Sequence, residues 1–111
     1  MKTIEFEKVV ESTLNQIREV LISKSKEYSR NNDKLHNFNV GARMTGEIRE
    51  KVLAGFALKH QISIQDMRND LKKGLLPSIE TVNDKFGDAI NYLILEKASI
   101  VDRINNDLGT E

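Results

Sequence analysis

The sequence contains no cysteine, no tryptophan and a single proline. The absence of cysteine excludes disulfides, thiolate nucleophiles and zinc–thiolate sites, and it is typical of a reducing compartment. Any metal ion would have to be bound by oxygen or imidazole ligands. Six glycines, one proline and little alternation of apolar and polar residues favour long helices over strands.

An excess of charge of one sign is also missing. The 17 Lys and Arg residues balance the 17 Asp and Glu residues, so no net field attracts the chain to duplex DNA or to an anionic membrane. Nucleic acid is therefore not an expected partner. No apolar run approaches the length of a membrane span, and Met1 to Glu5 lack the apolar core of a signal peptide. We expect a cytoplasmic protein, in the host cell cytoplasm if a phage encodes it.

The length of 111 residues fits one domain, residues 1–111. Hydrophobic residues make up 39% of the chain and charged residues 31%, which provides only a thin core. Self-association would bury more apolar surface. We therefore predict an all-α fold, a compact bundle of three long helices and one short helix, completed by homo-oligomerisation.

The 3.6-residue periodicity places these helices. The first runs from about Thr3, its N-cap, to Ser29, and a short one covers 38–44. A long helix follows the cap Thr45-Gly46-Glu47 and lasts until about 71. Gly74 is expected to end it, and Ser78 is expected to cap a last helix over about 79–105.

Each long helix carries an apolar stripe that is predicted to face the core. The stripes consist of Ile4, Phe6, Val10, Leu14, Ile17, Val20 and Leu21 in the first helix, Ile48, Val52, Leu53, Phe56, Ile64, Met67 and Leu71 in the middle one, and Ile79, Val82, Phe86, Ile90, Leu93, Val101 and Ile104 in the last.

Two polar residues lie on these stripes. Lys24, followed by Tyr28 on the same side, must pair with a carboxylate, bind a ligand phosphate or extend its ammonium outward from the helix end. His60 lies among apolar residues of the middle helix, as either a hydrogen-bonded core residue or a ligand-binding one. Lys59 and Asp66 lie at the edge of that stripe.

The last helix places Asp84, Asp88 and Asn91 at i, i+4 and i+7, with Tyr92 adjacent. Two carboxylates one turn apart repel each other, so the arrangement favours a bound cation. One interpretation is a solvated outer surface, since charged groups usually face water. The other is contact with a second helix or subunit, because residues 89–95 are apolar nearly all round.

The loop of residues 31–38 is rich in amides and includes His36 and Asn37. Polar loops between rigid helices often carry function. Ordinary turn and capping chemistry would explain the same residues.

Taken together, the segments 24–28, 36–38, 59–60 and 84–93 resemble small phage-encoded helical proteins related to the MazG-like all-α nucleoside triphosphate pyrophosphohydrolases. The likeness spans most of the chain through loose motifs. It implies Mg²⁺-assisted attack of water on the α-phosphate, with two acidic pairs holding the metal. Asp84-Lys85-Phe86-Gly87-Asp88 looks like the second pair with a spacing one residue longer. Glu47-Ile48-Arg49-Glu50 has the letters of the first pair but lies at a helix start.

The resemblance leads to one hypothesis about activity. Asp84 and Asp88 would be the catalytic metal ligands, joined by Glu27 or Asp66. The other expected roles are phosphate neutralisation by Lys24 and Lys59, base stacking on Tyr28 or Tyr92, and further substrate contacts from His36, Asn37, His60 and Asn91.

Two alternatives remain open at the level of sequence. A phage module could bind or sequester a nucleotide, or inhibit a host defence protein, without catalysis. A structural helical oligomer would need no small-molecule site at all.

Overall fold

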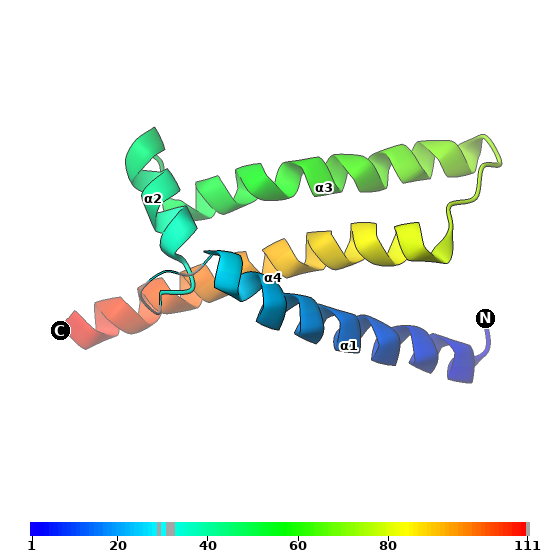
Figure 1. The fold of residues 1–111 in the computed structure, drawn as a ribbon, viewed down its shortest axis with the longest axis horizontal. Coiled ribbons are helices and arrows are strands. Elements are labelled where there is room, and N and C mark those ends of the chain that lie inside the picture. The colour runs from blue at the N-terminus through cyan, green and yellow to red at the C-terminus, as the bar shows by residue number, and fades with distance from the viewer. Residues whose placement is uncertain (29, 31–32, 111) are drawn as a thin grey trace.

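The computed structural model describes the backbone of residues 1–28, 30 and 33–110, and the side chains of residues 1–23, 30 and 33–106. This part of the chain forms four helices and no strand (Figure 1). The helices are α1 (Thr3–Tyr28), α2 (His36–Thr45), α3 (Arg49–Lys72) and α4 (Ile79–Thr110). The prediction of an all-α bundle with three long helices and one short one is confirmed.

The connection from α3 to α4 follows the predicted local chemistry. Gly74 has a φ of 78°, and the N–H groups of Gly74 and Leu75 donate to the carbonyls of Leu71 and Asp70, each at 3.0 Å. This pair of bonds is a Schellman motif, which ends a helix at a left-handed glycine. Ser78 Oγ then accepts a hydrogen bond from the Thr81 N–H at 3.1 Å. Both predicted caps are confirmed.

The start of α3 differs from the prediction. Thr45 belongs to the end of α2, where its hydroxyl donates to the Gly41 carbonyl at 2.7 Å. Gly46 follows in the left-handed conformation, with a φ of 70°, and ends that helix. The N-cap position of α3 is Ile48. The prediction that Thr45 to Glu47 caps α3 is therefore wrong, because Gly46 reverses the chain first.

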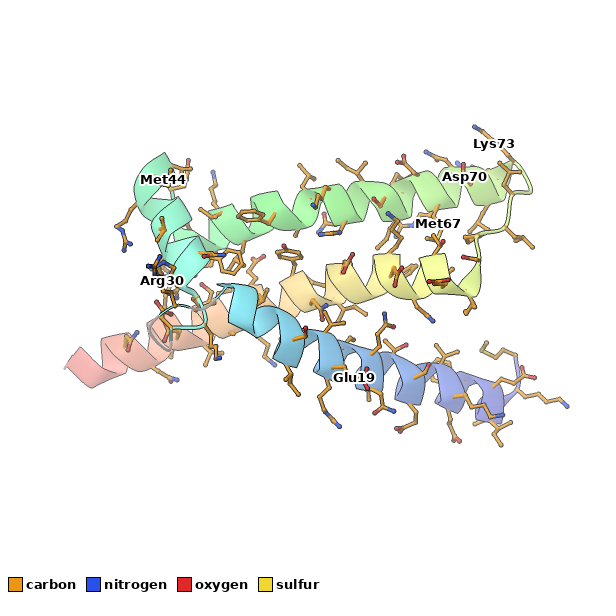
Figure 2. The ribbon with its side chains drawn as sticks, viewed as in Figure 1. Glu19, Arg30, Met44, Met67, Asp70 and Lys73 are labelled. Carbon is orange, nitrogen blue, oxygen red and sulfur yellow. The ribbon has the colours of Figure 1, made fainter. Side chains whose placement is uncertain are left out.

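The helices form an open arrangement. The two helices α3 and α4 run antiparallel side by side, α2 lies across one end of them, and α1 follows α4 but diverges from it toward the N-terminus (Figure 1). Figure 2 shows Met67 on the side of α3 that faces α4, with Lys73 pointing away at the helix end. The buried core cluster lies at the α2 end and comprises Leu35, Phe38 and Leu53, with Val52, Tyr92 and Leu95 against it.

The predicted apolar stripes differ in how far the single chain buries them. On α3, Leu53, Ile64 and Met67 are buried as predicted. On α1, most of the predicted core stripe is exposed, and Ile17 is the buried member among the described side chains. A thin core therefore forms around α3 and leaves α1 loosely covered.

The orientation of α4 is the reverse of the predicted one. Its predicted core residues are largely exposed, for example Ile79 and Leu93, whereas Asn91 and Ser99 on the other side are buried. The prediction is wrong for the single chain because α3 packs on the side that carries Tyr92, Leu95 and Ser99.

The molecule is elongated. Its radius of gyration is 16.8 Å and its principal extents are 53 × 30 × 23 Å, whereas a compact domain of this length has a radius of about 13 Å. Among the described residues, no helix is both long and apolar enough to cross a membrane. The longest extent is close to the length of α4, since its 32 helical residues span about 48 Å at 1.5 Å per residue.

Candidate functional site

A polar cavity of about 610 Å³ lies between α1 and α4 and is called the α1–α4 cleft below. It is lined by Gln16, Ile17 and Val20 from α1 and by Thr81, Asp84, Lys85, Gly87, Asp88 and Asn91 from α4. The spacing of i, i+4 and i+7 brings the polar residues of α4 to one side of the helix. This is where the predicted acidic residues meet another helix.

Gly87 allows α1 to approach α4 closely. A Cβ atom at Gly87 would lie 3.1 Å from Nε2 of Gln16. That same Nε2 donates to the Asn83 carbonyl at 3.1 Å. The glycine and this hydrogen bond together define one wall of the α1–α4 cleft.

Asn91 lines the cleft and has a buried side-chain oxygen without a partner among the described residues. The residue is 6% exposed, and its Oδ1 has no hydrogen-bond partner in the part of the chain that the structure describes. A buried polar atom without a partner costs about 1–3 kcal/mol, so native proteins rarely keep one without a reason. A cation or a hydrogen-bond donor brought by a ligand would satisfy it.

Asp88 connects the cleft to α3. Its Oδ2 lies 3.6 Å from Nδ1 of His60, and the His60 ring stacks on Tyr92 with centroids 5.2 Å apart. Tyr92 also stacks on Phe56 at 6.4 Å, and Phe56 meets Phe38 edge-on at 5.7 Å. His60 therefore lies on the apolar side of α3 because it faces a carboxylate and an aromatic ring of α4.

The structure brings together only part of the predicted site. Asp84 is exposed at the edge of the cleft, while Asp88 and Asn91 are more deeply placed. Tyr92 is engaged with His60 and Phe56, so its ring packs within the bundle.

Other predicted residues lie elsewhere. Lys59 is exposed and lines a different cavity, of about 600 Å³, together with Lys51 and Phe56. Asp66 is exposed on α3 and is not among the residues lining the α1–α4 cleft. At the start of α2, His36 is half-buried and Asn37 is exposed.

Three predicted residues cannot be placed by their side chains. Lys24, Glu27 and Tyr28 belong to the last turns of α1, and their side chains lie outside the described residues.

The two glutamates that resemble a first metal pair are separated by their contacts. Glu47 is exposed, with Oε2 4.0 Å from Nζ of Lys51. Glu50 accepts hydrogen bonds from the Ser99 hydroxyl and from Nε of Arg103 at 2.7 Å. The carboxylate of Glu50 therefore binds α4 and does not line the α1–α4 cleft.

Arg49 joins the same buried polar network. Its Nε donates to Ser99 Oγ at 2.6 Å and its NH2 nitrogen to the Ser99 carbonyl at 2.8 Å. The NH2 nitrogen also donates to Asp102 Oδ2 at 3.1 Å, and NH1 donates to Asn39 Oδ1 at 3.0 Å. One guanidinium thus links α2, α3 and α4.

The pKa of Glu50 reflects this network. Burial raises the pKa of the carboxyl, but hydrogen bonds from Ser99 and Arg103 and the positive charge of Arg103 outweigh that effect and lower the pKa below its ordinary value of 4.5. Glu50 therefore remains ionised in the folded protein and stabilises the α3–α4 contact. One feature of the sequence pointed to this contact: Ser99 lies on the same side of α4 as Asp88 and Leu95.

The described residues offer few side chains that could bind a metal ion. Among the described residues, no group of three or more His, Asp or Glu side chains is placed to hold one. The α1–α4 cleft offers two carboxylates, Asp84 and Asp88, and the unpartnered oxygen of Asn91. Mg²⁺ is commonly bound by one or two carboxylates together with waters and substrate phosphates. These oxygens fit such a mode.

Sequence reasoning missed three polar residues of the cleft, Gln16, Thr81 and Lys85. Lys85 directly follows Asp84 in the sequence, and this adjacency was the available signal. No family model matches the chain, and the comparisons with curated proteins and with solved structures gave no match either.

Proposed function

We propose that the α1–α4 cleft binds the phosphate groups of a nucleoside triphosphate together with Mg²⁺, and that the chain is a nucleotide pyrophosphohydrolase of the MazG-like type. The observation that carries the proposal is the buried, unpartnered Oδ1 of Asn91 beside two carboxylates in a polar cavity. This arrangement costs stability in the free protein, and a ligand-bound cation would offset the cost.

The residues of the cleft divide into three roles. Asp84 and Asp88 bind the metal ion, with Asn91 Oδ1 as a further oxygen. Lys85, which lines the same cavity, neutralises phosphate charge in the position that the sequence assigned to Lys24 and Lys59. His60 orients Asp88 from the α3 side, since its Nδ1 lies 3.6 Å from the carboxylate.

The proposed reaction is hydrolysis at the α-phosphate. A water molecule attacks the α-phosphorus, the bond from that phosphorus to the α–β bridging oxygen breaks, and pyrophosphate leaves with its electron pair. The nucleoside monophosphate keeps the water oxygen. Bound Mg²⁺ would stabilise the charge that develops on the phosphate oxygens.

A second function is binding without catalysis, as expected of a module that sequesters nucleotides. The presence of only two carboxylates among the described lining residues favours it, because a hydrolytic metal centre usually has more. Nucleotide binding that persists in EDTA, with no pyrophosphate released, would support this function over hydrolysis.

The test compares two exposed aspartates. Calorimetry and pyrophosphate release are measured with a panel of nucleoside triphosphates, in Mg²⁺ and in EDTA. We expect Asp84→Asn to lower turnover at least about 100-fold, because a metal ligand is worth several kcal/mol in the transition state. Asp66→Asn makes the same change of charge on α3, outside the cleft, and should leave turnover unchanged.

Neither function survives if the wild-type protein shows no binding heat and no rise in melting temperature with any nucleotide and Mg²⁺. A bound ligand must stabilise the folded state. Equal effects of Asp84→Asn and Asp66→Asn would place the ligand outside the α1–α4 cleft.

A further inference from the structure

The outer side of α4 carries an apolar stripe. Its N-terminal half borders a cavity shared with Val9 and Thr13 of α1, and the described residues leave its C-terminal half largely uncovered. The residues of this outer stripe recur with the helical period and lie on one side of the helix. They are Ile79, Val82, Phe86, Ala89, Ile90, Leu93, Ile100, Val101 and Ile104. Asn83 and Lys97 interrupt it. At 1.5 Å per residue the stripe is about 38 Å long. Leu93, near its middle, is 59% exposed.

The exposure of the outer stripe follows from the way α3 packs. The opposite side of α4 contributes Tyr92 and Leu95 to the core and supplies Ser99, which is 0% exposed, to the Arg49 network. Within the chain, α4 therefore buries its more polar side. Burying apolar surface contributes about 25 cal/mol of favourable free energy for each Å² removed from water. A partner that covers the outer stripe is therefore favoured.

The total surface indicates how large that partner contact is. The accessible surface of the chain is 8361 Å², whereas a compact monomer of 12.7 kDa exposes about 6,200 Å² by the scaling of surface with mass. The difference is about 2,100 Å². A permanent homodimer removes about 1,000–2,500 Å² from each subunit. This excess, summed over the whole open chain, is as large as one stable dimer interface requires.

We propose that the partner is a second copy of this chain, whose outer stripe packs against this one across a two-fold axis. The stripe is apolar apart from Asn83 and Lys97, and an apolar surface is complementary to a second copy of itself. The formal net charge of zero leaves no long-range repulsion between copies. A hollow of about 280 Å³ is lined by Leu93, Ile100 and Val101, with Glu96 and Lys97 beside them. Its apolar part receives apolar side chains of the second copy.

Sedimentation velocity with a matched pair of variants tests the proposal. The wild-type protein should sediment at about 25 kDa, twice the mass of the 12.7 kDa chain. Leu93→Glu should weaken dimerisation at least about a hundred-fold, because it buries a charge in the interface of both subunits. Leu58→Glu is the control, since Leu58 is similarly exposed, at 54%, but lies on α3, and it should remain dimeric.

A second experiment covers the case in which Leu93→Glu does not fold. Because the natural chain has no cysteine, Leu93→Cys introduces a single thiol near the middle of the outer stripe. With oxidised glutathione it should form a disulfide-linked dimer, and Leu58→Cys should not. A wild-type mass of one chain overturns the proposal, as does a Leu93→Glu protein that stays dimeric. Cross-linking through residue 58 instead of residue 93 would do the same.

Discussion

Replacing Glu50 by glutamine should destabilise the fold although it preserves the shape of the side chain. The two oxygens of Glu50 accept from two different donors, Oε2 from the Ser99 hydroxyl and Oε1 from Nε of Arg103. Glutamine offers one oxygen and one NH₂ group. One of the two donors therefore loses its acceptor, and the other loses the charge that strengthened its bond.

The magnitude follows from these contacts. A hydrogen bond to a charged group contributes about 1.5–3 kcal/mol, and a neutral one about 0.5–1.5 kcal/mol. The side chain of Arg103 is 49% exposed, so water screens its share of the loss. We expect Glu50→Gln to lower the free energy of unfolding by about 2 kcal/mol, from these hydrogen-bond values.

Urea denaturation followed by circular dichroism measures this loss. With a slope of about 1.5 kcal/mol per molar urea, the midpoint should fall by about 1.3 M. Glu47→Gln is the control, because Glu47 is exposed and its contact with Lys51 is 4.0 Å long; its effect should stay within about 0.5 kcal/mol. All proteins are compared at one concentration, since the stability of the proposed dimer would depend on it. Equal midpoints for the two variants would refute the role assigned to Glu50.

The remaining predictions concern pH and three single positions. Because the folded pKa of Glu50 lies below its ordinary value of 4.5, its stabilisation is complete above that pH and is lost as the pH falls through the lower folded value; acid titrations of unfolding should show a smaller loss for Glu50→Gln than for the wild type. Gly41→Ala should destabilise the protein, because a Cβ there would lie 2.9 Å from Val52 Cγ1, whereas Gly55→Ala, with nothing within 4 Å, should stabilise it by about 0.5–1 kcal/mol in thermal melts. Asn91→Leu should raise the melting temperature of the free protein and reduce its affinity for nucleotide in calorimetry, because it removes a buried oxygen that lacks a partner. A lower melting temperature for Asn91→Leu would contradict that reading of the cleft.

The sequence by itself determined the helices and several of their ends. Periodicity and composition are local properties, and so are the caps formed by Gly74 and Ser78, which depend on backbone bonds within a few residues. The same locality explains the error at Thr45, where a left-handed Gly46 ended one helix before the next began.

For the candidate site, the sequence placed Asp84, Asp88 and Asn91 on one side of a helix, because that requires only the helical repeat. It could not say which helix that side would meet. The contributions of Gln16 and Lys85 to the cleft, and the separation of Lys59 from it, depend on how α1 and α3 lie against α4.

Only the tertiary structure decided which side of α4 faces inward. An apolar stripe shows that a helix buries one side, but it does not show whether the cover comes from the same chain or from another copy. Here the Ser99 and Glu50 contact directs the more polar side of α4 toward α3, and much of the apolar side stays exposed in the single chain. Long-range packing, which is a property of the whole chain and its assembly, selects between these two orientations.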